Sequence, residues 1–452
     1  MRRRLPQRFR AAALALLVAG CTPTEPGTAF STPSPTRNPS AAPTAEPAGT
    51  ATPLTRAGDL EYLLARLEGL HPEPFVGSSE TEFRDSVEAL ADEADALSDT
   101  EFMTSTMRLL AGRPRDGHTG VVAFEQADGV VDAWPLALYE FEEGTYVAAA
   151  LEPHDDLVGA RLTAVGGRPL DEVLPLVAEL VPGDNEWSVR ARVPGYLVVP
   201  QVLEGLRLLR PGEPALTLEL PAGETRSLTP TTIPMSEFRE WRGLFDPLVP
   251  PSLPPRDDGP LHLRNRDQRF WSERVEGAIY VGYNQVQASI PSTGELIATF
   301  AARVADEARR GDLDIVVDMR HNPGGENGSY PPLRDMLFEI AASRPGSVTV
   351  IAGRSTFSAA SQLLSELRAG AGDAIRVVGE PTGGAPNMFG DGRRIELPAS
   401  GLTVSIATRS WTPNPADTGL TIEPDLAVPV RWADFAAGRD PALDAALAAA
   451  RG

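Results

Sequence analysis

Three stretches between residues 57 and about 115 carry apolar side chains at helical spacing. In each stretch the apolar positions recur three or four residues apart, as in a helix that buries one face. The positions are Leu60, Leu63, Leu64, Leu67 and Leu70, then Phe83, Val87 and Leu90, then Phe102, Met107, Leu109 and Leu110. They predict a small helical cap over residues 57–125 that ends in a loop bearing His118.

The C-terminal part of the chain alternates short apolar runs with helical patterns. The runs are rich in β-branched residues, which is typical of fully buried strands. They are Ala278 to Tyr283, Leu313 to Val317 and Val348 to Ala352. Helical patterns follow over Thr293 to Arg310 and over about Ser358 to Leu367. Because alternating strands and helices favour a mainly parallel sheet, residues 261–452 are predicted to form an α/β catalytic domain.

Between these two parts the pattern changes to short strands separated by turns. Residues 130–232 are therefore predicted to be rich in β-structure, with helices over Asp171 to Leu180 and in an insert from Asn185 to Leu209. A Pro-rich stretch over residues 233–260 is predicted to be a linker.

The first twenty residues have the composition of an export signal. Met1 to Arg10 holds five arginines, and Ala11 to Gly20 is apolar with small residues. This run is far shorter than the ~20 residues that a membrane-spanning helix needs. Leu17-Val-Ala-Gly-Cys21 resembles a bacterial lipobox, whose cysteine is lipidated after cleavage. Residues 1–20 are thus predicted to be a lipoprotein signal peptide, and Cys21 the anchor of an extracytoplasmic protein on the bacterial cell membrane.

The segment after the signal adds a further expectation about the exported protein. Residues 21–56 are mostly Pro, Thr, Ser, Ala and Gly, a composition that predicts a disordered tether. Removal of the signal with its five arginines lowers the formal net charge from −21 to −26. A body this acidic argues against nucleic acid as a partner and against electrostatic adhesion to anionic lipid. Cys21 is the only cysteine, so no disulfide is expected.

Two segments in the C-terminal half carry the candidate chemistry. Asp318-Met-Arg-His-Asn-Pro-Gly-Gly325 follows a predicted strand and is the kind of turn that exposes backbone N–H groups. In the second segment Ser358 lies where a helix is expected to begin. Its hydroxyl can cap that helix, which is the commoner role. It can also attack a substrate, with the N–H of Ala359 and that of Gly324 or Gly325 holding the resulting oxyanion.

Several motifs in this chain resemble those of the S41 peptidases, the family of tail-specific and tricorn-like serine proteases. They are Arg115-Asp-Gly-His-Thr119, Asp318-Met-Arg-His-Asn-Pro-Gly-Gly325, Thr356-Phe-Ser-Ala-Ala360, Gly379-Glu-Pro-Thr-Gly-Gly384 and Gly419-Leu-Thr-Ile-Glu-Pro-Asp425. They occur in the family's order and cover most of the mature chain. The resemblance implies a ClpP/crotonase-like α/β core with an N-terminal helical cap. It also implies that the β-rich region is PDZ-like, although a β-rich spacer fits the pattern equally well.

The absence of lysine bears on which residue could be the general base. The tail-specific branch uses a lysine, but this chain contains none, and arginine stays protonated. The tricorn-like branch uses a histidine, and the resemblance implies His118 as the base and Glu423 as the residue that completes the relay. The tricorn pattern has a serine where this chain has Gly117, which leaves Asp116, Thr119 or a water to orient the ring.

The chain has five histidines, and four of them compete poorly with His118. His71 is expected to have a structural role at a helix end, and His154 and His262 are expected to be solvated. His321 is the closer rival because it lies in the glycine turn, but the task of that turn is to present N–H donors. No His/Glu helix signature or thiol pair indicates a metal site.

The sequence therefore predicts an extracytoplasmic serine peptidase that acts through an acyl-enzyme on peptide or protein substrates. Its predicted site is Ser358, His118 and Glu423, with an oxyanion hole formed by Gly324, Gly325 and Ala359, and no metal or organic cofactor. Two other functions stay open: a non-catalytic ligand- or peptide-binding lipoprotein on the same fold, and an esterase or amidase. The oligomeric state is also left open.

Overall fold

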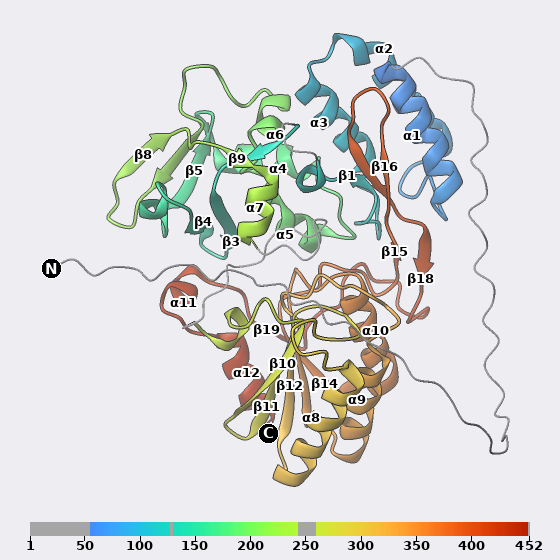
Figure 1. The fold of residues 1–452 in the computed structure, drawn as a ribbon, viewed down its shortest axis with the longest axis vertical. Coiled ribbons are helices and arrows are strands. Elements are labelled where there is room, and N and C mark those ends of the chain that lie inside the picture. Colours follow the sequence, from blue (N-terminus) through green and yellow to red (C-terminus); the bar gives the residue numbers. More distant parts are fainter. Residues whose placement is uncertain (1–54, 127–129, 243–258, 451–452) are drawn as a thin grey trace, which may run out of the picture. The chain divides into compact units, whose positions relative to one another are not determined.

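The computed structural model describes residues 55–126, 130–242 and 259–450. Its N-terminal part contains the three predicted helices, drawn in blue in Figure 1. They are α1 (Arg56–Leu70), α2 (Glu80–Glu93) and α3 (Asp99–Leu110), with a 3₁₀ turn at Ala94–Ala96. Ser79 and Ser98 each form a capping box with the glutamate three residues on, which fixes where α2 and α3 begin. The apolar faces of these helices pack into one core.

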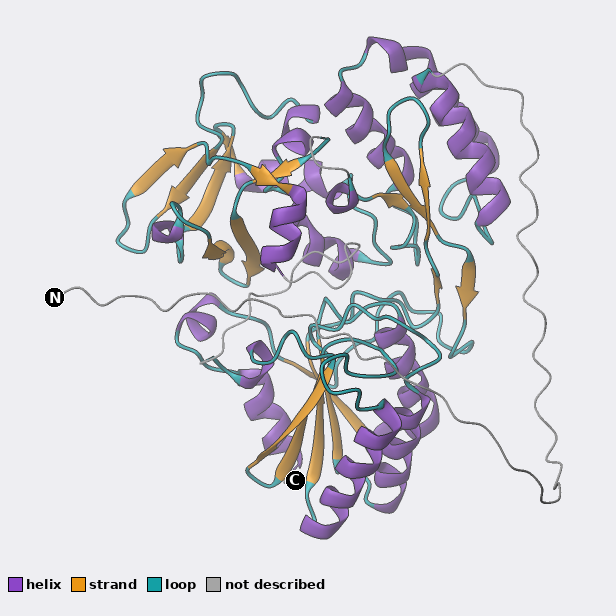
Figure 2. Ribbon diagram, viewed as in Figure 1, coloured by secondary structure: helices purple, strands orange, loops and turns teal. Residues whose placement is uncertain are grey.

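The β-rich region is also present, and Figure 2 shows its strands in orange. A main sheet has the order β3-β4-β5-β7-β8, and β6 pairs with β5. Its elements are β3 (Leu136–Phe141), β4 (Gly144–Ala150), β5 (Arg161–Val165), β6 (Arg168–Pro169), β7 (Leu216–Glu219) and β8 (Thr225–Leu228), with a 3₁₀ turn at Asp155–Leu157. Helix α4 (Leu170–Ala178) directly follows β6. The predicted helical insert consists of α5 (Glu186–Tyr196) and α6 (Pro200–Gly205), between α4 and β7.

The predicted linker is different in its first ten residues. Strand β9 (Ile233–Pro234) pairs with β2 (Asp132–Ala133), and helix α7 (Met235–Arg242) follows directly. Met235 and Phe238 are buried, so this part of the stretch belongs to the folded body in spite of its prolines. Residues 243–258 of the predicted linker lie outside the described residues.

The α/β core is a six-stranded sheet with helices on both faces. The strand order is β10-β11-β12-β13-β14-β19, in which β10 is antiparallel to β11 and the other pairs are parallel. The strands are β10 (Phe270–Val275), β11 (Ala278–Tyr283), β12 (Asp314–Asp318), β13 (Val348–Ala352), β14 (Ile375–Gly379) and β19 (Leu426–Ala427). Because β13 and most of β11, β12 and β14 are buried, they read as continuous apolar runs and not as alternating patterns.

Three helices connect these strands and pack together on one face. They are α8 (Ile297–Gly311), α9 (Pro331–Ser343) and α10 (Ala359–Ala371). Helix α12 (Pro441–Ala450), after the short α11 (Trp432–Ala436), packs on the other face (Figure 1). Helix α8 begins at Ile297 and not at the predicted Thr293, because the Thr293 side chain accepts a hydrogen bond from Glu295 N within a turn. Further 3₁₀ turns lie at Ala123–Glu125, Leu261–Leu263 and Gly372–Ala374.

A segment of the predicted catalytic domain leaves the core and returns to the helical cap. Strand β17 (Thr403–Ile406) pairs with β16 (Arg393–Glu396) and with β1 (Gly120–Val121), which follows the His118 loop. A second pair, β15 (Met388–Gly390) with β18 (Arg409–Trp411), lies at the base of the same hairpin. No pattern in the sequence predicted this pairing, which draws the loop bearing His118 toward the core.

Candidate active site

Ser358 lies where the chain passes from β13 into α10. Its backbone has φ 51° and ψ −127°, a conformation that costs a residue with a side chain about 1–3 kcal/mol. Its hydroxyl makes no hydrogen bond that caps the helix. The commoner role of a serine at this position is therefore absent.

The glycine turn, residues 318–325, is fixed against the serine by Asn322. This fully buried side chain donates to Tyr283 O at 2.8 Å and accepts from Gly324 N at 2.9 Å. The backbone carbonyl of Asn322 accepts a hydrogen bond from the N–H of Phe357, one residue before Ser358, at 3.0 Å. Asn322 thus holds the turn and the serine loop at a set distance from each other.

Two of the three predicted oxyanion donors are available. Gly325 forms a parallel bridge with Val286, in which the flanking residues make the hydrogen bonds, so the N–H of Gly325 points the other way. Within the described ranges, neither this N–H nor that of Ala359 has a hydrogen-bond partner. The N–H of Gly324, in contrast, is taken by Asn322. A Cβ on Gly324 would lie 2.6 Å from Ser358 Cβ, so its role is close approach and not donation.

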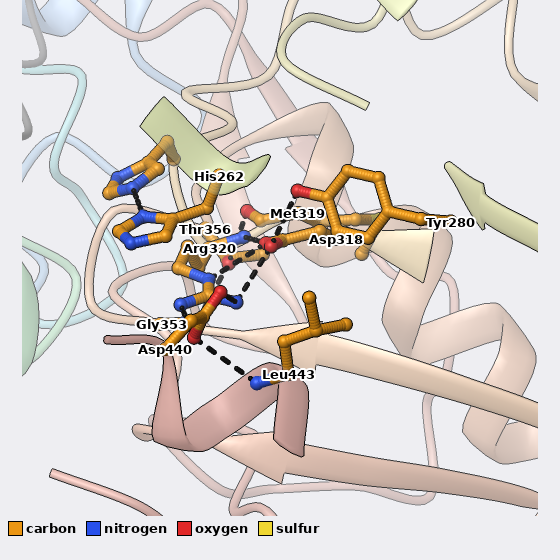
Figure 3. A network of polar contacts seen from close by, with 10 residues as sticks. His262, Tyr280, Asp318, Met319, Arg320, Gly353, Thr356, Asp440 and Leu443 are labelled. Carbon is orange, nitrogen blue, oxygen red and sulfur yellow. Dashed lines mark hydrogen bonds and ion pairs between the residues drawn. The ribbon is translucent and has the colours of Figure 1, made fainter. Parts of the chain in front are cut away.

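A buried polar network braces the turn from behind (Figure 3). Arg320 makes ion pairs with Asp318 at 2.7 Å and with Asp440, at the start of α12, at 2.8 Å. Tyr280 OH donates to Asp318 at 2.9 Å. Thr356 Oγ1 donates to Met319 O at 2.8 Å, which joins this network to the serine loop. Nothing in the sequence pattern predicted that these residues form a buried polar network.

His118 is brought to the serine from the other side. Its Nε2 lies 3.1 Å from Ser358 Oγ, within hydrogen-bond distance. The ring is buried and stacks on Phe357, with 4.8 Å between the ring centroids and 22° between the planes. Burial and the charge of Arg192 lower the pKa of His118 to about 4, although Asp116 opposes this shift. The ring is therefore neutral at pH 7 and can accept a proton at Nε2.

Phe357 explains why Gly117 stands where the tricorn pattern has a serine. A Cβ on Gly117 would lie 2.8 Å from Phe357 Cζ and 3.1 Å from Asp184 Oδ1, so no side chain fits there. The residues that were expected to orient the ring are engaged elsewhere: Asp116 lies 3.0 Å from both His71 Nε2 and Arg113 Nε. Thr119 Oγ1 accepts from Ala407 N at 3.0 Å.

The structure does not bring Glu423 to this pair. Its side chain is exposed, whereas the His118 ring is buried. Its carbonyl accepts from Arg368, in the last turn of the helix whose first turn follows Ser358. Nδ1 of His118 is buried without a hydrogen bond to any residue that the structure describes, and the nearby carbonyl of Phe389 favours the protonated ring. The third member of the predicted site is thus not in place.

The other histidines are placed away from the serine. His71 ends α1 and faces Asp116, as its structural role predicted. His262 was expected to be solvated, but it is buried and its Nδ1 lies 2.9 Å from His321 Nε2. Because this pairing turns His321 toward His262, the geometry favours His118 over its closest rival. Both histidines line a cavity with Tyr139 and Arg354 that does not include Ser358.

Two further predictions concern metals and the anchor. No group of three or more His, Cys, Asp or Glu side chains in residues 55–126, 130–242 and 259–450 could hold a metal ion. In the same ranges no helix has the length and apolar character to cross a membrane. Cys21, the signal and most of the tether lie outside the described residues.

Comparison with known proteins supports the fold. No family model and no curated protein matches the chain. A solved structure of mature CPAF complexed with lactacystin has a TM-score of 0.57 at 13% identity, covering 88% of this chain and 98% of that one. A structure of mature CPAF alone has a TM-score of 0.54 at 13% identity, covering 85% and 94%. The photosystem II D1 C-terminal processing protease has 16% identity and a TM-score of 0.37, too low to support a conclusion.

At this identity the likeness establishes the fold alone. The chain has the fold of CPAF, which confirms the predicted mixed α/β class. What that fold does in this chain has to be inferred from its own residues.

Proposed function

We propose that this protein is a serine peptidase that uses Ser358 as nucleophile and His118 as general base. The observation that carries this proposal is the 3.1 Å distance between His118 Nε2 and Ser358 Oγ, at a serine with a strained backbone that does not cap its helix. A buried neutral imidazole beside a serine hydroxyl is the arrangement that removes the hydroxyl proton as the oxygen attacks.

The steps follow from the positions of the atoms. Ser358 Oγ bonds to the substrate carbonyl carbon while its proton passes to His118 Nε2. The carbonyl oxygen becomes an oxyanion, held by the N–H groups of Gly325 and Ala359. When the carbon–nitrogen bond breaks, the leaving amine takes the proton from His118. A water then gives a proton to His118 and attacks the acyl carbon. The bond between that carbon and Ser358 Oγ breaks, Oγ takes the proton from His118, and the acid is released.

The cellular setting is part of the same proposal. The lipobox-like segment before Cys21 supports export and lipid anchoring on the outer face of the bacterial cell membrane. Peptides or proteins in that compartment are the proposed substrates. The anchor is tested by growing cells with radiolabelled palmitate. We expect the label on the wild-type chain and none on Cys21→Ser. An unlabelled wild-type chain would contradict the anchor.

The activity is tested by mapping a fluorophosphonate adduct on the full chain by mass spectrometry. We expect labelling at Ser358, none in Ser358→Ala, and a labelling rate in His118→Ala lower by about 10³-fold or more. His154→Ala is the control, because it removes a histidine at the 3₁₀ turn Asp155–Leu157 of the β-rich region, outside both the glycine turn and the serine loop. Labelling should persist in that variant.

The outcomes separate the candidate functions. An unlabelled but folded wild-type protein would favour a ligand-binding protein on the same fold. Labelling together with cleavage of simple esters, but of no member of a peptide library, would favour an esterase or amidase. Peptide cleavage that disappears in Ser358→Ala is the result that the proposal requires.

A further inference from the structure

The backbone N–H and the backbone carbonyl of Gly117, just before His118, are each held by a buried side chain. Its N–H donates to Asp184 Oδ1 at 2.6 Å, and its carbonyl accepts from Arg192 Nη1 at 3.0 Å. Asp184 and Arg192 are each 1% exposed. Two ionisable side chains are thus buried against the backbone of the residue that precedes His118.

The same two side chains also reach the serine loop. Asp184 Oδ2 accepts from Ala385 N at 2.9 Å, and the preceding Gly384 donates to Thr356 O at 3.0 Å. The Arg192 guanidinium lies 4.6 Å from the centroid of the Phe357 ring, on which the His118 ring stacks. Asp184 and Arg192 therefore connect the loop of the base to the loop of the nucleophile.

We propose that Asp184 and Arg192 are positioning residues for His118, which hold Nε2 within hydrogen-bond distance of Ser358 Oγ without a carboxylate on Nδ1. This inference rests on the proposed function. Neither side chain contacts the reacting oxygen, so both act through Gly117 and Phe357. We call the two side chains, Asp184 and Arg192, the Gly117 clamp. The clamp takes over the task that the tricorn pattern gives to a serine and a glutamate.

The charge state of Asp184 links this clamp to pH. An ionised carboxylate accepts hydrogen bonds at both oxygens, as the two N–H groups require, whereas a protonated carboxyl gives up one acceptor position. Burial raises the pKa of Asp184 to about 7, against the two backbone hydrogen bonds and Arg192. The charged groups that face it are Arg192, from α5, and Asp116, which makes its own ion pair with Arg113.

Asp184 lies next to a cleft, although its own exposed fraction is 1%. Asp184 lines a cleft of about 470 Å³ together with Arg108, Arg113 and Glu179. Because the ionised form fits the clamp, reactivity should rise as the pH passes upward through about 7. Protonation of His118 lowers reactivity only near pH 4, so the two groups act in separate pH windows.

The test is the second-order rate of fluorophosphonate labelling at Ser358 between pH 5 and pH 9, on the full chain. In the wild type we expect a rise with a midpoint near 7. In Asp184→Asn we expect a rate lower by about 10- to 100-fold at pH 8, as for a misplaced catalytic group, and no step near 7.

The chain offers a matched control. Asp59 is as buried as Asp184, and its two oxygens likewise accept backbone N–H groups, those of Ala399 and Ser400, each at 2.7 Å. Asp59→Asn should cost similar stability in thermal unfolding but keep both the rate and the step. A wild-type rate in Asp184→Asn, or a step near 7 that persists in it, would overturn the positioning role.

A second measurement distinguishes failure of the proposed function from failure of the positioning role. If the wild-type protein is not labelled at any pH, the peptidase proposal fails, and ¹⁵N NMR of the His118 ring decides the positioning role. Ring shifts that change in Asp184→Asn but not in Asp59→Asn support the clamp. Unchanged ring shifts in both variants contradict it.

Discussion

The two sides of the candidate site are held in different ways. On the serine side, Thr356 accepts from Gly353, three residues away, and donates to Met319, 37 residues away within the same α/β core. On the histidine side, the N–H and the carbonyl of Gly117 are held by side chains 67 and 75 residues along the chain. The serine side is thus built from adjoining motifs, and the histidine side from separate parts of the fold.

This difference matters for how each side tolerates change. On the serine side the groups that hold the nucleophile loop, Asn322 and Thr356, are neutral, and the buried ion pairs of Arg320 lie within the α/β core, so this geometry is set once the core has formed. The histidine side depends on buried charges, whose arrangement is sensitive to protonation and to the packing of distant segments. The largest effects on chemistry are expected on the first side, and the strongest pH dependence on the second.

The serine side is broken most directly at Asn322. Asn322→Ala frees the N–H of Gly324 and the carbonyl of Tyr283, and it releases the turn that presents Gly325. We expect a fall in kcat/KM of about 10²- to 10³-fold, as for loss of an oxyanion donor. Each group left unsatisfied should cost about 1–3 kcal/mol of unfolding free energy. Peptide or ester hydrolysis and chemical denaturation measure the two effects.

Asn284→Ala is the control for this variant. Asn284 is also buried and donates to two backbone carbonyls, of Asn265 and Gln268, away from Ser358. It should lose stability but little activity. Equal losses of activity in both variants would show that Asn322 acts only through stability, and would contradict its role in the site.

The same contrast explains what could be read from the sequence. The helical periodicity and the apolar runs predicted α1 to α3 and β11 to β13, because these elements bury a face or a whole strand and so leave a regular pattern. The motif around Ser358 indicated its position before α10, since a motif is a local signal. Gly325 and Ala359 were predicted as donors for the same reason.

Other features lie between residues that are far apart in the chain. The pairing of β1 with β17 and the clamp on Gly117 leave no periodic signal, because a single buried Asp or Arg resembles a surface residue until its partners are known. His262 was misread as solvated for this reason, since its partner His321 comes from another element. Gly324 was counted among the oxyanion donors because the sequence does not show that Asn322 takes its N–H.

The histidine side is tested at Gly117 by restoring the residue of the tricorn pattern. If the pattern alone governed the site, Gly117→Ser would improve activity. The structure predicts the opposite, because the new Cβ would lie 2.8 Å from Phe357 Cζ and push apart the stack on which His118 rests. We expect kcat/KM to fall by about 10- to 100-fold. Gly328→Ser, at a glycine with open space around it, should stay near the wild-type rate.

The smallest effect is expected at Glu423, and it sharpens the comparison most. If the relay were built as the family pattern implies, Glu423→Gln would lower kcat/KM by several orders of magnitude. Because the side chain is exposed, we expect a change of about twofold or less, the range of ordinary surface substitutions. Glu339→Gln, which removes an exposed carboxylate on α9, sets the baseline in the same assay.

The opposite result would come from a relay that forms only with substrate. A loss of more than about 100-fold in Glu423→Gln alone, about 2.7 kcal/mol of transition-state stabilisation, would mean that the carboxylate reaches His118 when substrate is bound. In that case the Gly117 clamp would hold the base only in the free protein.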